Sequence, residues 1–435
     1  MIVPLSRVPR RMQSSLRAFA LVLLATLTTR AADLPVDWVD PTTGHRVVRL
    51  STEPGTTSMY FNVAAYTPDG KKLIVNEPHG ISVIVLATQK IERVIDGRVG
   101  VVGVGRKSGN IYYVRRGDSG AQLFVTSTAD GTTRKVVDLA ANESVGTINA
   151  DETLAAGTTV VHATSLHPDG TLTGPQPEPA KAGLTHAQQK DLMLHRRLEA
   201  HIPMTLFTID LKTGTRKTLL SSTDWLNHLE FSPVDPKALL FCHEGVWQEV
   251  DRLWLIQTDG TGLTKVHQRT MAMEIAGHEF WSADGKTIWY DLQTPRGEDF
   301  WLAGFEVATG HRTQYHLERN EWSVHYNISP DGTLFAGDGG DSEMVAHAPD
   351  GKWIWLFTPE LRAIEGTVAG TDLNSLIAPG VFHGERLVNM AKHNYTLEPN
   401  VTFSPDMKWL IFRSNMFGPT HVFAVEIART GPGKL

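Results

Sequence analysis

The sequence lacks several features that would have pointed to other classes of protein. It has 435 residues and a single cysteine, Cys242, so no disulfide can form within the chain. Lys and Arg number 41 against 47 Asp and Glu, and the formal charge of −6 gives no basic footprint for nucleic acid. Apolar residues make up 41% and charged residues 20%, which excludes a disordered or fibrous chain. We therefore expect a globular protein stabilised by its own core.

Long apolar runs are also missing, apart from a short one at the N-terminus. Residues 18–27 are apolar, follow four arginines and precede small residues at positions 29, 31 and 32. This pattern predicts a secretory signal peptide over residues 1–31, because a membrane span needs about 20 apolar residues. A retained N-terminal anchor is the alternative. Cleavage removes five arginines and no acidic residue, so the charge of residues 32–435 becomes −11. We expect a periplasmic or secreted protein that is not inserted in the membrane.

What the sequence does contain is a repeated unit of an apolar strand, a turn of the Ser-Pro-Asp-Gly type and a second strand. Pro, Asp and Gly are the residues that tight hairpins need. A second hairpin with an Asp-Gly or Thr-Gly turn follows, so each unit contains four strands. Seven such units predict an all-β fold, a seven-bladed β-propeller. The turns lie at residues 67–70, 232–233, 282–285, 329–332 and 404–406, with degenerate copies at 108–110 and 149–151.

Two gaps between repeats are longer than the rest. The first, between Asp151 and Pro233, contains a Pro-rich stretch at 175–179 and a predicted helix over residues 186–199. We expect a small helical insertion at about residues 165–203, which either pads the propeller or overhangs its channel. The second gap, between Asp331 and Asp406, shows few strand signals and is expected to form loops.

Histidines recur at equivalent places in the repeats. His228, His278 and His325 each come just before the apolar residue and Ser of a turn, where the last repeat has Glu398-Pro399-Asn400. Equivalent positions of successive blades face the same end of the central channel, so these side chains are expected to converge. Imidazoles with a carboxylate suit a divalent ion such as manganese. The alternative is that each histidine is a hydrogen-bonded turn residue.

A fourth histidine and an arginine lie in the same region. His243 ends the second strand of its repeat, in Phe-Cys-His-Glu-Gly, which makes it a better candidate base than ligand; a neutral imidazole suits a base near neutral pH. Arg252 is a candidate for bidentate binding of a carboxylate. A surface ion pair with Asp251 or Glu249 is the alternative for Arg252.

Together these residues make the sequence similar to the oligogalacturonate lyases, seven-bladed propeller enzymes that split short pectic fragments by β-elimination. The similarity runs from about residue 40 to the C-terminus. It implies that His243 is the base and that His278 is a manganese ligand, while His228 and His325 are left to bind substrate. The matching segments are residues 225–228, 241–245, 250–255, 277–281, and His325 with residues 329–339.

The family takes its further metal ligands from a Q-x-x-H-P-H stretch before the last repeat. Here Tyr395, Glu398 and Asn400 replace the glutamine and both histidines. The resemblance then implies that Glu398 and Asn400 supply oxygen ligands and that the nearby His393 compensates for a lost one. Such ligation keeps manganese as the expected ion and also suits magnesium or calcium.

The resemblance also implies a mechanism and a partner, an acidic oligosaccharide. A metal on the uronate carboxylate stabilises the charge that develops when the C5 proton leaves. His243 takes that proton, Arg252 holds a substrate carboxylate, and the C4 oxygen departs. Two alternatives stay open, a non-catalytic propeller like that of the TolB translocation protein, and a lyase for another uronate.

Overall fold

The computed structural model describes residues 34–117, 120–160, 184–363, 369–372 and 375–431. The chain divides into two units, Met1–Leu34 and Pro35–Leu435, and the fold described below is that of the second. The predicted signal peptide at residues 1–31 and the Pro-rich stretch at 175–179 lie outside the described residues. No helix in the described part of the chain combines the length and apolarity that crossing a membrane requires.

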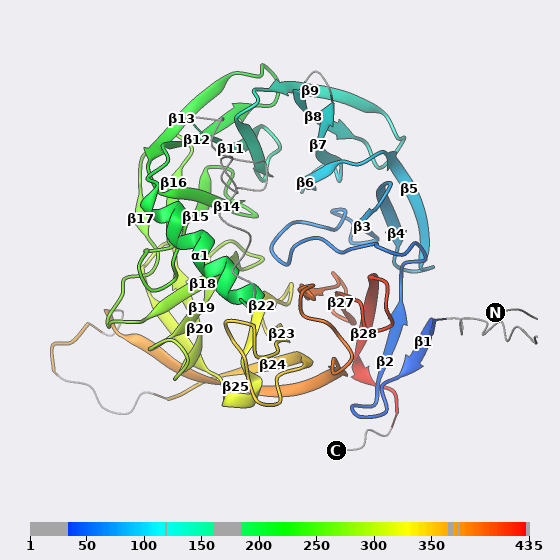
Figure 1. The fold of residues 1–435 in the computed structure, drawn as a ribbon, viewed down its shortest axis with the longest axis vertical. Helices are drawn as coiled ribbons and strands as arrows, with labels where there is room; N and C mark the ends of the chain where they lie inside the picture. Colours follow the sequence, from blue (N-terminus) through cyan, green and yellow to red (C-terminus); the bar gives the residue numbers. More distant parts are fainter. Residues whose placement is uncertain (1–33, 118–119, 161–183, 364–368, 373–374, 432–435) are drawn as a thin grey trace, which may run out of the picture. The chain divides into compact units, whose positions relative to one another are not determined.

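Antiparallel sheets dominate the second unit and follow one another as blades around a ring (Figure 1). In blade 1 an isolated bridge between Tyr66 and Leu73 adds an inner segment to three strands. Blade 1 contains β3 (Lys72–Glu77), β4 (Gly80–Val85) and β5 (Lys90–Asp96). Blade 2 contains β6 (Gly100–Val104), β7 (Ile111–Gly117), β8 (Gly120–Thr126) and β9 (Thr133–Leu139). Blade 3 contains β10 (Glu143–Ile148), β11 (Leu154–Val160), β12 (Met204–Asp210) and β13 (Arg216–Ser222).

The next three blades carry the predicted histidines. Blade 4 contains β14 (Trp225–Phe231), β15 (Ala238–Glu244), β16 (Leu253–Gln257) and β17 (Thr264–Lys265). Blade 5 contains β18 (Ile275–Trp281), β19 (Thr287–Gln293), β20 (Phe300–Glu306) and β21 (Arg312–His316). Blade 6 contains β22 (Ser323–Ile328), β23 (Phe335–Gly339), β24 (Trp353–Leu361) and β25 (Ile377–Asn389). Blades 5 and 6 share one sheet, because β21 pairs in parallel with β25.

Blade 7 joins the two ends of the second unit. Its inner strands come from the C-terminal part of the chain and its outer strands from the N-terminal part, since β28 pairs with β2. This pairing ties the first strands to the last and confirms the predicted seven-bladed propeller, with three strands in the sheet of blade 1, five in that of blade 7 and four in each of the others. The blade contains β26 (Thr402–Phe403), β27 (Trp409–Ser414), β28 (His421–Arg429), β2 (His45–Arg49) and β1 (Asp37–Val39).

The recurring turn is held by its own side chains. In blade 5 the Ser282 hydroxyl donates to Asp284 Oδ1 at 2.7 Å and accepts from the Thr287 amide at 3.0 Å. The same serine–aspartate bond recurs at 2.7 Å in blade 6 and at 2.6 Å in blade 7. The repeat visible in the sequence is therefore a hairpin whose polar groups satisfy one another.

The core is spread between the blades rather than gathered in one place. Six of its apolar clusters each draw side chains from adjoining blades, as where Leu240 and Leu255 of blade 4 pack with Ile288 and Tyr290 of blade 5. Sheets with both faces covered bury near-continuous apolar runs. This rigid ring fixes where the inner-strand side chains point.

The predicted helix is confirmed as α1 (His186–Glu199), in the insertion between β11 and β12. Thr185 caps it, accepting from the Gln188 amide at 3.3 Å in a capping box. The expectation of loops between Asp331 and Asp406 is wrong, because β24 and β25 pair there over nine positions. Pro359 and Pro379 interrupt the strand pattern in the sequence, yet both lie within these strands.

Candidate functional site

His228, His278 and His325 occupy the same place in three neighbouring inner strands. In β14, β18 and β22 the pairing register shifts at the histidine, so each strand contains a β-bulge there. Their φ angles are 47°, 48° and 47°, and Asn400 just before β26 has 54°. This left-handed conformation costs an L-residue about 1–2 kcal/mol. Strain repeated at one position in four blades marks that end of the channel as a candidate site.

Two of these histidines are oriented by an aspartate on the next strand. His278 Nδ1 lies 2.7 Å from Asp291 Oδ2, and His325 Nδ1 lies 3.0 and 3.1 Å from the two carboxylate oxygens of Asp338. An Nδ1–H that donates to a carboxylate leaves Nε2 as a free acceptor, which is the state needed for a metal ligand or a base. Equivalent strand pairs thus prepare two imidazoles in the same way.

The two prepared imidazoles lie against each other, beside a carboxylate. The ring centroids of His278 and His325 are 4.9 Å apart with planes at 67°. His325 Nε2 is 3.6 Å from Glu398 Oε2 and has no hydrogen-bond partner among the described residues. The side chain of His325 is fully buried, whereas those of His278 and Glu398 are 14% and 38% exposed. Solvent therefore reaches this group from the side of His278 and Glu398.

Electrostatic attraction between the two imidazoles and Glu398 stabilises this group of side chains. Burial disfavours the His325 imidazolium, but Asp338 and Glu398 outweigh it and raise the pKa of His325 above its usual value. Burial likewise raises the pKa of Glu398, but His325 and His278 oppose it more strongly and the pKa ends below the ordinary value. Glu398 therefore stays ionised beside the two imidazoles.

His228 belongs to a different arrangement. Its Nε2 lies 2.9 Å from Glu244 Oε2, and Glu244 also accepts from Arg252 Nη1 at 2.7 Å and from Nη2 at 3.2 Å. The guanidinium of Arg252 lies 4.2 Å above the Trp247 ring, and its side chain is 4% exposed. Burial works against ionised Glu244, but Arg252 and His228 hold its pKa well below the usual range. Arg252 is thus bound within the protein rather than open to a substrate or paired at the surface.

His243, the predicted base, lies apart from the His278–His325 pair. It is stacked on Trp254 with ring centroids 5.0 Å apart, and its Nδ1 is 3.4 Å from Asp224 Oδ2. Successive side chains of a strand point to opposite faces, so His243 is on the face of β15 opposite to Glu244. Its Nε2 is buried with no hydrogen-bond partner in the described part of the chain, and burial lowers its pKa. The structure therefore does not bring His243 to the other histidines.

The side chains of two predicted metal ligands, Asn400 and His393, form hydrogen bonds within the protein. Asn400 Oδ1 accepts from the Phe61 amide at 3.2 Å, and its Nδ2 donates to the Glu398 carbonyl at 3.1 Å. His393 Nδ1 lies 2.8 Å from Ser414 Oγ, and its Nε2 lies 2.6 Å from a backbone carbonyl. Both side chains are therefore already hydrogen-bonded within the protein.

The remaining donors fit a divalent cation in chemistry without forming a closed cluster. They are His325 Nε2, which is buried and accepts no hydrogen bond from the described residues, the Glu398 carboxylate and the neighbouring His278. Histidines that donate Nδ1–H to a carboxylate are typical of metal sites, and mixed nitrogen and oxygen donors suit manganese. Within the described ranges, no three His, Cys, Asp or Glu side chains are already arranged to hold an ion.

Sequence reasoning missed Asp291 and Asp338. A signal for them exists, because each follows its histidine by thirteen residues, from His278 to Asp291 and from His325 to Asp338. This spacing is the length of the hairpin that returns the chain to the bulge on the second strand. A search for carboxylates at the equivalent place in each repeat would have found both.

A segment from the N-terminal part of the chain separates this group from the rest of the channel. In Figure 1 the blue stretch before β3 reaches inward. The Phe61 amide donates to Asn400, its carbonyl accepts from Asn327 Nδ2 at 3.2 Å, and its ring lies 5.3 Å from that of His325. Phe61 also lines a cavity of about 210 Å³ that opens toward the turns. The segment therefore forms a floor beneath the histidines.

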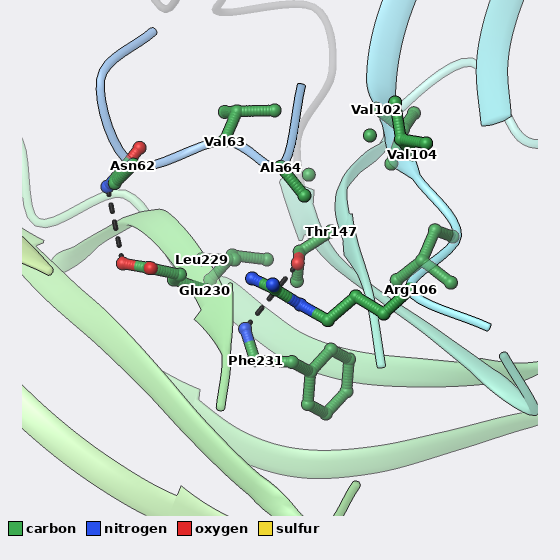
Figure 2. Close-up of a pocket in the computed structure, with 13 residues that line it drawn as sticks. Asn62, Val63, Ala64, Val102, Val104, Arg106, Thr147, Leu229, Glu230 and Phe231 are labelled. Atoms are coloured by element: carbon green, nitrogen blue, oxygen red, sulfur yellow. Dashed lines mark hydrogen bonds between the residues drawn. The ribbon is translucent and has the colours of Figure 1, made fainter. Parts of the chain in front are cut away.

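Figure 2 shows a smaller pocket on the turn side of this floor, where Asn62 Nδ2 donates to Glu230 Oε2 at 3.3 Å and Arg106 extends into the same space. Burial raises the pKa of Glu230 well above its usual value, although Arg106 opposes this. The pocket measures about 30 Å³, enough for only about one or two water molecules. It is too small for a sugar, and the adjoining cavity of about 210 Å³ has no histidine among its lining residues, so the histidine end is the better candidate site.

Comparison with known sequences gives a partial match to one family. Residues 195–430 match the family model described as oligogalacturonate lyase. The oligogalacturonide lyase of Pectobacterium atrosepticum is 28% identical over 233 residues, and the oligogalacturonate lyase of Dickeya dadantii is 27% identical over 227 residues. Each match covers 51% of this chain and 55% of the relative, so the chain spans about half the length of the curated relatives it matches.

Comparison with solved structures covers nearly the whole chain. An oligogalacturonate lyase in complex with manganese superposes with a TM-score of 0.69 and 23% identity, over 90% of this chain and 96% of that one. The oligogalacturonate lyase of Vibrio parahaemolyticus superposes with a TM-score of 0.69 and 19% identity, over 91% and 97%. At these identities the likeness shows the fold, a β-propeller.

Proposed function

This chain belongs to the oligogalacturonate lyase family, and from that membership we propose that it cleaves short acidic oligosaccharides of the oligogalacturonide kind by β-elimination. One observation carries the proposal beyond the family match. The Asp291–His278 and Asp338–His325 pairs meet at one end of the channel, with ring centroids 4.9 Å apart. Elimination from a uronate needs a base at C5 and a means to neutralise the neighbouring carboxylate, and these two imidazoles suit the two tasks.

We assign the base to His278. Its Nδ1–H donates to Asp291, so Nε2 is free to accept a proton, and the side chain is partly exposed to an incoming sugar. His278 Nε2 takes the C5 proton as general base, the C4=C5 double bond forms as the C4–O bond breaks, and the departing oxygen takes a proton from solvent. Asp291 stabilises the resulting imidazolium. This assignment differs from the expected base, His243, because His243 is stacked on Trp254 on the face of β15 opposite to Glu244, whereas His278 lies against His325.

His325 and Glu398 are the residues that would hold a divalent metal, with His278 beside them. A bound divalent cation supplies positive charge for the substrate carboxylate and so makes the adjacent C5 proton more acidic. The chain itself orients His325 through Asp338 and keeps Glu398 ionised, as the lowered pKa of Glu398 indicates. Manganese is the ion of first choice, with magnesium and calcium as the oxygen-preferring alternatives.

We further propose that the protein acts in the periplasm or outside the cell. The basic, apolar and small-residue pattern of residues 1–31 supports export. The mature N-terminus, determined by mass spectrometry on protein from the periplasmic fraction, tests this. We expect a start near residue 32, and an intact Met1 on cytoplasmic protein would contradict export.

The test of activity is incubation of the purified protein with a panel of uronate oligosaccharides, following the ultraviolet absorbance of the unsaturated product. We expect product from oligogalacturonides, loss of the rate on chelation and recovery on adding manganese. No product from any uronate oligomer with metal supplied would overturn the proposal and favour a non-catalytic propeller. Product that is unaffected by chelator would remove the metal from it.

A further inference from the structure

The helix α1 lies over the histidine end of the propeller. Leu194 packs with Val246 and Trp247 of blade 4 and with Ile275 of blade 5, while Val345 of blade 6 lies against the same cluster. Figure 1 shows α1 crossing this side of the ring. Trp247 in turn lies 5.2 Å from the ring of His278. The helix α1 is therefore placed as a cover beside the site rather than as padding at the rim.

Helical periodicity decides which side chains α1 turns toward the propeller. Residues i, i+4 and i+7 lie on one face of a helix, so Lys190 shares a face with Leu194 and Arg197, both of which are buried. Arg197 lies 4.6 Å above the Trp225 ring of β14. Lys190 is the member of this face nearest the start of the helix and is itself exposed. It is therefore directed at the propeller and still open to solvent.

Lys190 differs from the other cations near the site because none of the described residues forms a hydrogen bond or an ion pair with it. Arg252 is bound by both oxygens of Glu244. Arg413 donates through Nε to the Glu398 carbonyl at 2.7 Å and through Nη1 to the Ser58 carbonyl at 3.4 Å. Lys190 makes no hydrogen bond or ion pair with any residue that the structure describes. After His325 and His278, its charge also contributes to the lowered pKa of Glu398, against the effect of burial.

The negative electrostatic potential at this end of the channel is unfavourable for a polyanionic substrate. The carboxylates of Glu398, Asp291 and Asp338 surround the histidines, and the chain as a whole is negatively charged. Removal of residues 1–31 makes that charge more negative still. A free, flexible ammonium at the entrance would attract the substrate and offset this repulsion.

We propose that Lys190 is a substrate-binding residue, which receives the carboxylate of a sugar neighbouring the one that reacts, and that α1 serves to present it. The inference rests on the proposed function, since it takes a uronate oligomer as the ligand. It assigns to Lys190 the substrate-binding role predicted above for Arg252, because Arg252 is bound by Glu244. Lys190 binds and does not take part in the chemical step, so its loss weakens binding and leaves the turnover of bound substrate intact.

The experiment compares Lys190→Gln and Lys190→Arg with the matched control Arg196→Gln, an exposed residue of α1 on another face. With oligogalacturonide at low salt, we expect K190Q to raise KM about tenfold with kcat changed less than twofold, and K190R to restore most of the loss. The defect should shrink at high ionic strength, because salt screens exposed charges. R196Q should match the unaltered protein.

A binding measurement separates this inference from the proposed function. In the His278→Ala background, calorimetry should show oligogalacturonide binding about tenfold weaker when K190Q is added. If the unaltered protein is an active lyase but K190Q matches it in KM and affinity, or R196Q is equally impaired, the role of Lys190 is wrong and the proposed function stands. If the unaltered protein neither cleaves nor binds uronate oligomers, both fail together.

Discussion

Blades 2 and 3 share a feature with blades 4 to 6 but not their chemistry. The inner strands β6 and β10 contain register shifts at Val102 and Gly146, like those at the three histidines. Neither Val102 nor Gly146 has a positive φ angle, whereas each histidine does. The bulge is thus common to the inner strands of blades 2 to 6, whereas a histidine with a left-handed backbone stands at the bulge in blades 4 to 6 alone among these five. A site arises where the residue at the bulge and its partner on the next strand are both polar.

The largest expected effect is a loss of catalysis when the bulge histidine of blade 5 is replaced. His278→Ala should lower kcat on oligogalacturonide about a thousandfold, because loss of a general base costs about 10²–10⁴. His243→Ala is the matched control, since His243 lies on the other face of β15, stacked on Trp254. It should keep at least a third of the activity. The reverse outcome, with H243A inactive and H278A active, would restore His243 as the base.

Arg252→Met removes the cation of the buried Arg252–Glu244 pair while keeping a side chain that packs on Trp247. Breaking a buried ion pair by removing one partner costs about 3–5 kcal/mol, so we expect a loss of that order in the free energy of unfolding, measured with urea. The exposed Lys135–Asp138 pair, 2.8 Å apart, is the control, and Lys135→Met should change stability by less than about 1 kcal/mol. Equal, small effects would show that Arg252 does not hold the site together.

Asp291→Asn tests whether the aspartate on the second strand is what turns a bulge histidine into a base. Residues that orient a histidine in this way typically contribute about 10–100-fold, so kcat should fall by that factor with KM nearly unchanged. Asp299→Asn is the matched control, because Asp299 contacts His316 at 3.9 Å away from the channel. An unchanged kcat in D291N would remove Asp291 from the site.

The smallest effect lies outside the channel and depends on pH. The pKa of Glu274 is lowered from 4.5 to about 2 because hydrogen bonds from His267 and Thr270 outweigh its burial. Its contribution to stability is therefore full above about pH 4.5 and is lost as the pH falls toward 2. Glu274→Gln should lower stability by about 1–2 kcal/mol at pH 7. The difference in melting temperature between the unaltered protein and E274Q should become smaller below pH 4.5. A difference that stays constant with pH would show that ionised Glu274 does not stabilise the fold.

Much of the fold could be predicted because it depends on local signals. The serine–aspartate turns satisfy their own hydrogen bonds, so they appear in the sequence wherever a hairpin occurs, and α1 begins at a capping box of Thr185 and Gln188. The strands β24 and β25 could not be predicted from the sequence, because Pro359 and Pro379 lie inside them. Their pairing comes from long-range contacts that no local pattern records.

The site could be predicted in part, for a related reason. His278 and His325 share a repeat position, and position in the repeat determines which end of the channel a residue faces. His243 and Arg252 lie near them in sequence, but strand alternation turns His243 to the other face and Glu244 binds Arg252. Asn400 and His393 are occupied by hydrogen bonds to distant parts of the chain. The position of a residue in the repeat predicts which end of the channel it faces. Whether its polar atoms are already hydrogen-bonded depends on tertiary contacts, which the sequence does not show.

The central claim is that His278 and His325 form the reacting centre of a lyase. Mass spectrometry of the products of a defined oligogalacturonide, with manganese supplied, tests it most directly. Elimination adds no water, so the masses of the two fragments should sum to that of the substrate, and one fragment should carry the unsaturated sugar. These products should be absent with H278A. Fragments that together contain an added water molecule, or no fragments at all from the unaltered protein, would contradict the claim.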